Sequence, residues 1–105
     1  MVQVANDSDF EQLLANHEKV VVKYFAGWCG TCRLFAPKYK KIAEKEQHDG
    51  ILFLDINAEE NPEARKKAGV SNLPFFAVFK NGKLLAADTT AKEEGVEALI
   101  GRLAD

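Results

Sequence analysis

The stretch Tyr24-Phe25-Ala26-Gly27-Trp28-Cys29-Gly30-Thr31-Cys32-Arg33-Leu34-Phe35 holds the only two cysteines of the chain. The β-branched and aromatic run Val20–Phe25 leads into it and predicts a strand, and a helical pattern leads out of it from Arg33. The cysteines therefore fall where a strand gives way to a helix. A thiol at a helix N-terminus faces unpaired N–H groups and the positive end of the helix dipole, and both favour the thiolate over the thiol.

Length and composition indicate one ordinary globular domain, residues 1–105, that can bury a core without metal or disulfide staples. Hydrophobic residues make up 47% of the chain and charged residues 29%, which excludes disordered, collagen-like and coiled-coil classes. A net charge of −2 offers no basic surface for nucleic acid. No apolar run approaches the ~20 residues that span a bilayer, so we expect no membrane partner.

The first residues, Met1–Asp7, lack the basic and apolar regions of a secretory signal, which predicts a cytoplasmic location. In a reducing compartment two cysteines do not form a structural framework. A Cys-x-x-Cys pair beside a βαβ pattern is typical of a redox motif instead.

Hydrophobic periodicity predicts an α/β fold. The expected strands are Val2–Ala5, Val20–Ala26, Ile51–Asn57, Phe75–Phe79 and Lys83–Ala87. The expected helices begin at the capping box Ser8–Glu11, at Cys29, at Asn61-Pro62 and at the capping box Thr90–Glu93. We expect the second helix to continue to Asp49-Gly50 and the third to end at Gly69. The Asn81-Gly82 turn makes the last two strands antiparallel, so about five strands form a mixed central sheet with about four helices on its two faces.

The spacing of the cysteines predicts thiol–disulfide exchange. Cys29 is expected to be exposed and nucleophilic, and to attack a substrate disulfide to form a mixed disulfide that Cys32, one turn further in, resolves. A zinc half-site is one alternative, but it needs about four ligands, and only His17 and His48 remain, far apart in sequence. An inert structural pair is the other, although the helix N-terminus behind Trp28 is a poor place for inert thiols.

The chain resembles the thioredoxin family over nearly its whole length. The motifs that carry the resemblance are Ala26–Cys32, Asn61-Pro62-Glu63, Val70–Pro74 and Phe79–Lys83, in the family's order and spacing. The resemblance implies a single thioredoxin-like domain with the thioredoxin fold and a cis Leu73-Pro74 step beside the cysteines. It also implies no bound cofactor besides a redox-active Cys29–Cys32 disulfide, and an NADPH-dependent flavoprotein, thioredoxin reductase, as electron donor.

By the same resemblance, an apolar surface around Cys29 docks protein substrates. It would consist of Trp28, Gly30, Leu73, Pro74 and Ala91. The backbone of Leu73 would pair with an extended peptide, although core packing is the alternative for its side chain. We expect Trp28 to lie exposed at the rim of the site.

Three residues near this surface depart from the family pattern. Thr31 replaces the usual proline, and its N–H and hydroxyl can stabilise the Cys29 thiolate, which would make the disulfide more oxidising. Phe75 replaces a frequent threonine and Thr90 a usual glycine. A bulkier docking groove and a narrower choice of substrates are expected.

The largest departure is an exchange of charges within two apolar strands. The family's buried aspartate falls on Lys23, and the lysine that partners it falls on Asp55. Pairing of the two is the economical arrangement, because a lone buried charge costs several kcal/mol, on the order of 3–5. Extension of one or both side chains to solvent is the alternative. Asp55 would inherit the proton transfer to the resolving cysteine, while Lys23 would lower thiol pKa values.

The sequence thus predicts a monomeric thiol–disulfide oxidoreductase that reduces protein disulfides through Cys29 and Cys32. Two alternatives stay open. One keeps the chemistry and reverses its direction, as in a thiol oxidant or isomerase. The other is a non-catalytic thioredoxin-like binding module in which the cysteines are incidental.

Overall fold

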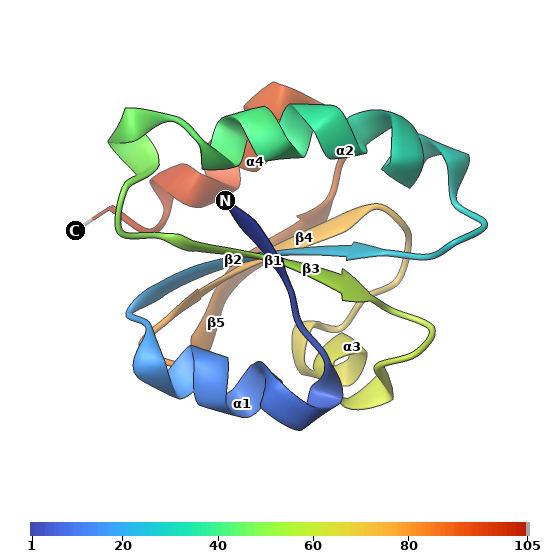
Figure 1. The fold of residues 1–105 in the computed structure, drawn as a ribbon, viewed down its shortest axis with the longest axis horizontal. Helices are drawn as coiled ribbons and strands as arrows, with labels where there is room; N and C mark the ends of the chain where they lie inside the picture. The colour runs from blue at the N-terminus through green and yellow to red at the C-terminus, as the bar shows by residue number, and fades with distance from the viewer. Residues whose placement is uncertain (105) are drawn as a thin grey trace.

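The computed structural model describes residues 1–104, and its centre is a five-stranded sheet with strand order β1-β3-β2-β4-β5 (Figure 1). The strands are β1 (Val2–Val4), β2 (Lys19–Phe25), β3 (Leu52–Asn57), β4 (Phe75–Lys80) and β5 (Lys83–Thr89). Strands β1, β3 and β2 run parallel, whereas β4 is antiparallel to β2 and β5 to β4. The mixed sheet expected from the sequence is confirmed.

Four helices pack on the two faces of this sheet. They are α1 (Asp7–Asn16), α2 (Gly30–Ala43), α3 (Pro62–Ala68) and α4 (Glu93–Gly101), and a short 3₁₀ helix, η1 (Glu46–His48), follows α2. Helices α1 and α3 cover one face, and α2 and α4 cover the other (Figure 1). Within residues 1–104, no helix has the length and apolar character that crossing a membrane requires.

Strand β2 lies at the centre because it is apolar toward both faces. Val22 and Tyr24 pack beneath α1 and α3, whereas Val21 packs beneath α2 and α4. Such burial stabilises the fold by roughly 25 cal/mol for each Å² of apolar surface removed from water. Lys23 interrupts this pattern, and it is buried on the α2 side with 3% of its surface exposed.

The β4–β5 hairpin forms as predicted around Asn81 and Gly82. Their φ angles are 53° and 82°, so both central residues of the turn adopt the left-handed conformation. Asparagine and glycine tolerate that conformation best, which explains why this dipeptide marks the turn.

Two helices begin at residues other than those predicted. Helix α1 has Asn6 rather than Ser8 as its N-cap, and the Asn6 N–H donates to Asp9 Oδ1 at 2.8 Å. Helix α4 has Lys92 as its N-cap. The Thr90 hydroxyl accepts the Lys92 N–H at 3.2 Å and so forms a local turn ahead of the helix, not the cap itself.

Helix α2 ends at Ala43, well before the predicted Asp49-Gly50. The Glu44 and Lys45 N–H groups donate three residues back, which tightens and closes the last turn. The chain then enters η1, whose His48 Nε2 lies 2.8 Å from Glu97 Oε1 of α4. This contact with α4 is one reason why α2 ends early. The local sequence gives no sign of it, because Glu97 is distant in the chain.

Candidate active site

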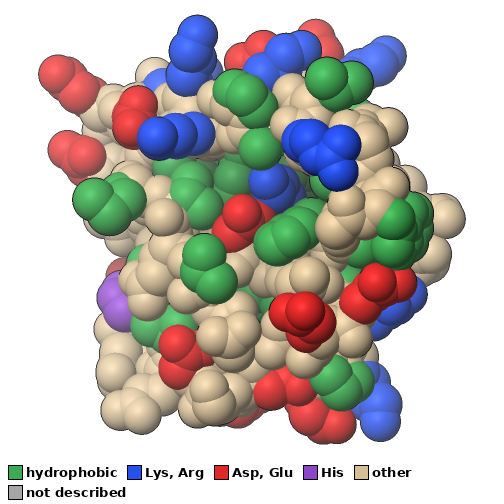
Figure 2. All heavy atoms as spheres, turned by 45° about the vertical axis from the view of Figure 1, so that its right-hand side comes forward, with side chains coloured by type: hydrophobic (Ala, Val, Ile, Leu, Met, Phe, Trp, Pro, Cys, Tyr) green, Lys and Arg blue, Asp and Glu red, His purple; other side chains and the backbone are tan. Residues whose placement is uncertain are grey.

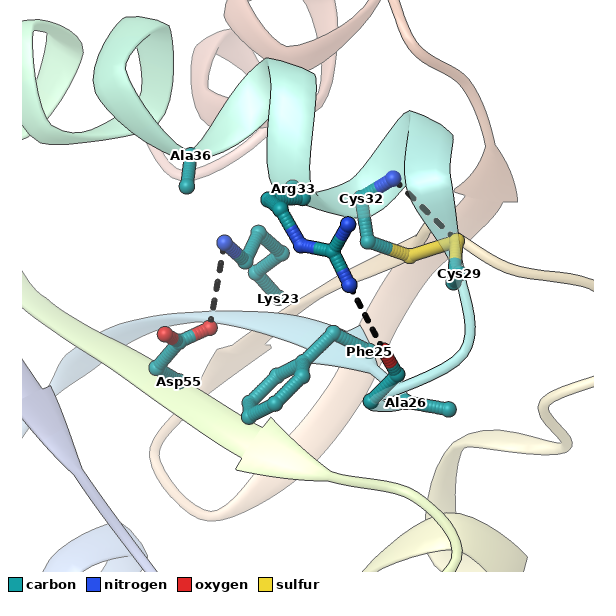
Figure 3. Close-up of a pocket in the computed structure, with 9 residues that line it drawn as sticks. Lys23, Phe25, Ala26, Cys29, Cys32, Arg33, Ala36 and Asp55 are labelled. Atoms are coloured by element: carbon teal, nitrogen blue, oxygen red, sulfur yellow. Dashed lines mark hydrogen bonds and ion pairs between the residues drawn. A yellow bond between two sulfur atoms is a disulfide. The ribbon is translucent and has the colours of Figure 1, made fainter.

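The two cysteines are joined by a disulfide at the start of α2 (Figure 3). Cys29 is the N-cap of the helix, and Cys32 lies in its first turn. The Cys32 N–H donates to Cys29 Sγ at 3.1 Å. The same N–H and the positive end of the helix dipole stabilise negative charge on this sulfur once the disulfide is reduced.

The expectation that Cys29 is exposed is wrong for this disulfide-bonded state. Cys29 keeps 6% of its surface exposed and Cys32 keeps 3%. The bond draws the Cys29 side chain toward Cys32, and both sulfur-bearing residues line a pocket beneath the helix. Trp28, immediately before them, is 68% exposed, as predicted.

Three segments that are distant in sequence meet at the cysteine end of the sheet. The strand register pairs Tyr24 with Phe75, and Phe75 with Thr89. This register places three segments at the same end of the sheet: the loop that leads to Cys29, the Leu73-Pro74 step and the segment that includes Ala91. The Leu73–Pro74 peptide is cis, as the family resemblance implied.

The predicted docking residues differ in exposure. Trp28, Gly30 and Ala91 are exposed, Leu73 is half-buried and Pro74 is buried. The expectation that Phe75 narrows the groove is wrong, because Phe75 is 6% exposed and its ring packs 6.2 Å from that of Tyr24 in the core.

Glu59 joins the site without having been predicted. The Trp28 Nε1–H donates to Glu59 Oε2 at 2.6 Å. Glu59 follows β3, and the register pairs Phe25 with Asn57 at the carboxyl ends of the two parallel strands. Residues that follow neighbouring parallel strands emerge at the same end of the sheet. This rule could have placed Glu59 near Trp28 from the sequence.

The pocket beneath the disulfide has a volume of about 220 Å³. Its lining includes both cysteines, Lys23, Asp55 and Arg33 (Figure 3). Arg33, which the sequence analysis did not single out, donates from Nη2 to the Gly27 carbonyl oxygen at 3.0 Å. It thereby ties the first turn of α2 to the loop that carries Trp28.

Lys23 and Asp55 form the ion pair that the exchanged charges predict. They are direct partners in the β2–β3 register, and Lys23 Nζ lies 3.4 Å from Asp55 Oδ1. The ammonium also lies 5.6 Å from the ring centroid of Phe25 and 5.4 Å from that of Tyr39. Two aromatic faces and one carboxylate thus compensate for the lost hydration of this cation.

The environment of Asp55 raises the proton affinity of its carboxyl. Burial raises the pKa of the Asp55 carboxyl, and the nearby charge of Lys23 opposes this only in part. Its Oδ1 is enclosed and has no hydrogen-bond partner within residues 1–104. Burial, with a further contribution from Asp55, also raises the pKa of Tyr39, whose hydroxyl donates to the Leu54 carbonyl oxygen at 2.8 Å. Asp55 is therefore the group of this cluster suited to take up and release a proton.

The two histidines lie elsewhere. His17 Nδ1 is 2.9 Å from the Leu13 carbonyl oxygen at the end of α1, and His48 pairs with Glu97. In the part of the chain that the structure describes, no three His, Cys, Asp or Glu side chains are grouped closely enough to hold a metal ion.

Comparisons with known proteins agree with this geometry. The family model for thioredoxin matches residues 1–103. Thioredoxin-1 of Schizosaccharomyces pombe is 31% identical over 98 residues, 93% of each chain. Protein disulfide-isomerase A4 of Mus musculus is 32% identical over 101 residues, 94% of this chain but 16% of that protein. The crystal structure of Malassezia sympodialis thioredoxin superposes with a TM-score of 0.88 at 28% identity, over 98% of this chain and 94% of that one. The chain belongs to the thioredoxin family, and its Cys29–Cys32 pair makes it a dithiol–disulfide oxidoreductase.

Proposed function

We propose that the protein works in the reducing direction in the cytoplasm, with Cys29 as nucleophile and Cys32 as resolving thiol. The observation that carries the role of Cys29 as nucleophile is its position as N-cap of α2, with its Sγ accepting the Cys32 N–H at 3.1 Å. The reducing direction follows the family resemblance. Reduced Cys29 attacks one sulfur of a protein disulfide and displaces the other as a thiolate. Cys32 then attacks Cys29, releases the second substrate thiolate and forms the disulfide.

Protein substrates dock on the surface formed by Trp28, Gly30, Leu73, Pro74 and Ala91. The convergence of their three segments at one sheet edge supports this assignment. The hydrogen bond from Trp28 to Glu59 holds the exposed indole beside the cysteines. The backbone of Leu73, just before Pro74, pairs with an extended peptide of the substrate.

Asp55 acts as the acid and base for Cys32, and Lys23 holds it in place. The raised pKa of Asp55 and its position in the lining of the pocket that both cysteines share support this role. The positive charge of Lys23 opposes protonation of nearby thiolates. It thus adds to the effect of the helix N-terminus.

The electron donor is an NADPH-dependent flavoprotein, thioredoxin reductase, as the family resemblance implies. The protein itself carries its electrons in the reduced Cys29 and Cys32 dithiol, which the reductase regenerates from the disulfide, and it needs no bound cofactor. It works as a monomer, without nucleic acid or membrane as partner. A lone redox pair, with no structural disulfides, suits a reducing compartment.

Insulin reduction driven by dithiothreitol tests the proposal. The wild-type chain should accelerate it, Cys29→Ser should abolish the acceleration, and Cys32→Ser should accumulate a mixed disulfide between Cys29 and insulin. Replacement of dithiothreitol by NADPH and thioredoxin reductase tests the electron donor. A Cys29→Ser protein as active as the wild type would exclude Cys29 as the nucleophile.

The opposite direction, as a thiol oxidant or isomerase, is the second candidate. Thr31 and the similarity to a mouse protein disulfide-isomerase favour it. Equilibration with glutathione decides between the two directions. A potential near that of glutaredoxins or below, about −200 mV or lower, fits a reductant, whereas one near −120 to −180 mV fits an oxidant.

A further inference from the structure

The Lys23–Asp55 pair lies between two hollows. The first is the pocket of about 220 Å³ beneath the disulfide. The second, of about 360 Å³, lies beside edge strand β1 and includes Val4 and Lys40 in its lining. Both are lined by Lys23, Ala36 and Asp55, which therefore form their common wall. The surface in Figure 2 is hollowed on this side of the molecule, with a basic and an acidic side chain next to each other in the hollow.

Asp55 is the member of the pair that reaches solvent. In the sheet it lies between Val4 of β1 and Lys23 of β2, its direct register partners. Its Oδ1 is fully enclosed, yet 24% of the side-chain surface is exposed, against 3% for Lys23. One oxygen thus lies inside the protein while another part of the same side chain meets water.

The charges around Asp55 single it out as a proton carrier. Lys23 faces it from β2 and Tyr39 from α2. Lys40 and Met1 line the second hollow, and Arg33 lines the first. Among the described residues that line the two hollows, Asp55 is the one carboxylate. The raised pKa of Tyr39 keeps its hydroxyl protonated, so Asp55 is left as the group that exchanges protons.

We propose that Asp55 exchanges the proton of Cys32 with solvent through the hollow beside β1, behind the face on which substrates dock. This inference rests on the proposed function and adds a route to it. A docked protein covers the Trp28 side of the cysteines and restricts water there. The β1 side stays open, because residues of edge strand β1, and none of the docking residues, line the hollow there.

The resolving step then balances as follows. The Cys32 thiol gives its proton to the Asp55 carboxylate, directly or through water in the pocket, as its sulfur attacks Cys29. The bond between the two cysteine sulfurs forms while the bond from Cys29 to the substrate breaks. The substrate sulfur leaves with the electron pair as a thiolate and takes a proton from solvent. Asp55 afterwards releases its proton into the hollow beside β1.

A tryptophan at Val4 should cover the second hollow without replacing a charged group. Val4 is 67% exposed, so the substitution places the ring on the surface next to Asp55. Leu84→Trp is the matched control, since Leu84 is 43% exposed on β5, the opposite edge strand. The measurement is single-turnover reduction of insulin by the reduced protein, with acid quenching to follow the decay of the mixed disulfide.

The mixed disulfide of Val4→Trp should decay about tenfold more slowly than that of the wild type, since acid–base catalysis contributes about 10² or more. Leu84→Trp should match the wild type. Equal decay in Val4→Trp and Leu84→Trp would overturn the route, whereas failure of the wild-type protein to reduce insulin would overturn the proposed function instead.

Chemical rescue provides a second test that does not depend on one variant. Asp55→Ala should resolve slowly, and formate should restore the rate by entering the vacated space. Adding Val4→Trp to Asp55→Ala should abolish this rescue, while adding Leu84→Trp should leave it intact. Rescue that is equal in both double variants would show that formate, and hence the proton, reaches Cys32 by another way.

Discussion

Replacing Lys23 with methionine removes one charge of the buried pair and keeps most of the packing. Methionine fills the space of the lysine stem. The change removes the ammonium group, which in the wild type lies 3.4 Å from Asp55 Oδ1 and 5.4 Å from the ring centroid of Tyr39. Asp55 is then left as a carboxylate without its ion-pair partner.

The cost follows from the burial of the two groups. Breaking a buried pair by removing one partner costs about 3–5 kcal/mol. The Asp55 side chain is 24% exposed and can take up a proton, so we expect Lys23→Met to lose about 2 kcal/mol of stability at pH 7.

The loss should depend on pH. Burial already raises the pKa of Asp55 above 3.8, and loss of the opposing lysine charge raises it further. A carboxyl whose pKa is raised on folding makes its full contribution to stability below pH 3.8, the value in the unfolded chain. That contribution is lost as the pH rises through the folded-state pKa. Lys23→Met should therefore lose stability more steeply than the wild type as the pH rises from 3.8 toward neutrality.

Urea unfolding followed by circular dichroism between pH 4 and pH 8 measures this directly. The set comprises the wild type, Lys23→Met, Asp55→Asn and the double variant. The double variant should be more stable than the sum of the single losses predicts, because each single change leaves the other group without its partner. Additivity within about 0.3–0.5 kcal/mol, or parallel pH profiles, would refute the reasoning.

Four further predictions concern other residues. Asp7→Ala should lower the free energy of unfolding in urea by about 1–2 kcal/mol, because the Asp7 carboxylate accepts two N–H groups of the first turn of α3, at 2.8 and 3.1 Å. Ser8→Ala, at the exposed neighbouring position, is the control and should change it little. Burial acts to raise the pKa of Glu97, but the hydrogen bonds with Lys45 and His48 outweigh it and lower that pKa below 4.5. The contribution of Glu97 to stability, about 0.5 kcal/mol, should therefore be present above pH 4.5 and be lost as the pH falls, and an unchanged acid profile in Glu97→Gln would contradict this. Thr31→Pro should lower the reduction potential measured against glutathione, and an equal or higher potential would remove the role of Thr31. Thr90→Gly should speed insulin reduction, and an unchanged rate would discard its effect on the groove.

The sequence by itself determined the elements whose signals are local. The apolar run of β2, the Asn81-Gly82 turn and the Cys-x-x-Cys spacing each depend on residues close together in the chain. Periodicity and turn chemistry act over such distances, so they predicted the sheet, the hairpin and the position of Cys29. The family resemblance added the cis Leu73–Pro74 step, which a single sequence does not otherwise indicate.

The helix starts show where local signals fail. Asp7 caps α3 with its carboxylate, while its own N–H donates to Asn61 Oδ1 at 2.7 Å. The starts of α1 and α3 thus supply hydrogen-bond acceptors for each other's backbone N–H groups, although Asp7 and Asn61 are 54 positions apart in the chain. No rule that looks three or four residues ahead detects such a partner, which is why the capping box at Ser8 was the wrong start.

The cysteine motif shows the same division. Its spacing fixed the chemistry, because two thiols at the start of a helix can form and break a disulfide wherever the helix is packed. Tertiary structure decided what surrounds them: Cys29 is buried in the disulfide-bonded state, Arg33 reaches the loop before it, and Lys23 faces Asp55. Those two charges are 32 positions apart in sequence, 23 to 55, and only the parallel register of β2 and β3 makes them neighbours. Bond-forming capacity is a property of the residues, whereas the electrostatic field in which it operates depends on which distant strands pair.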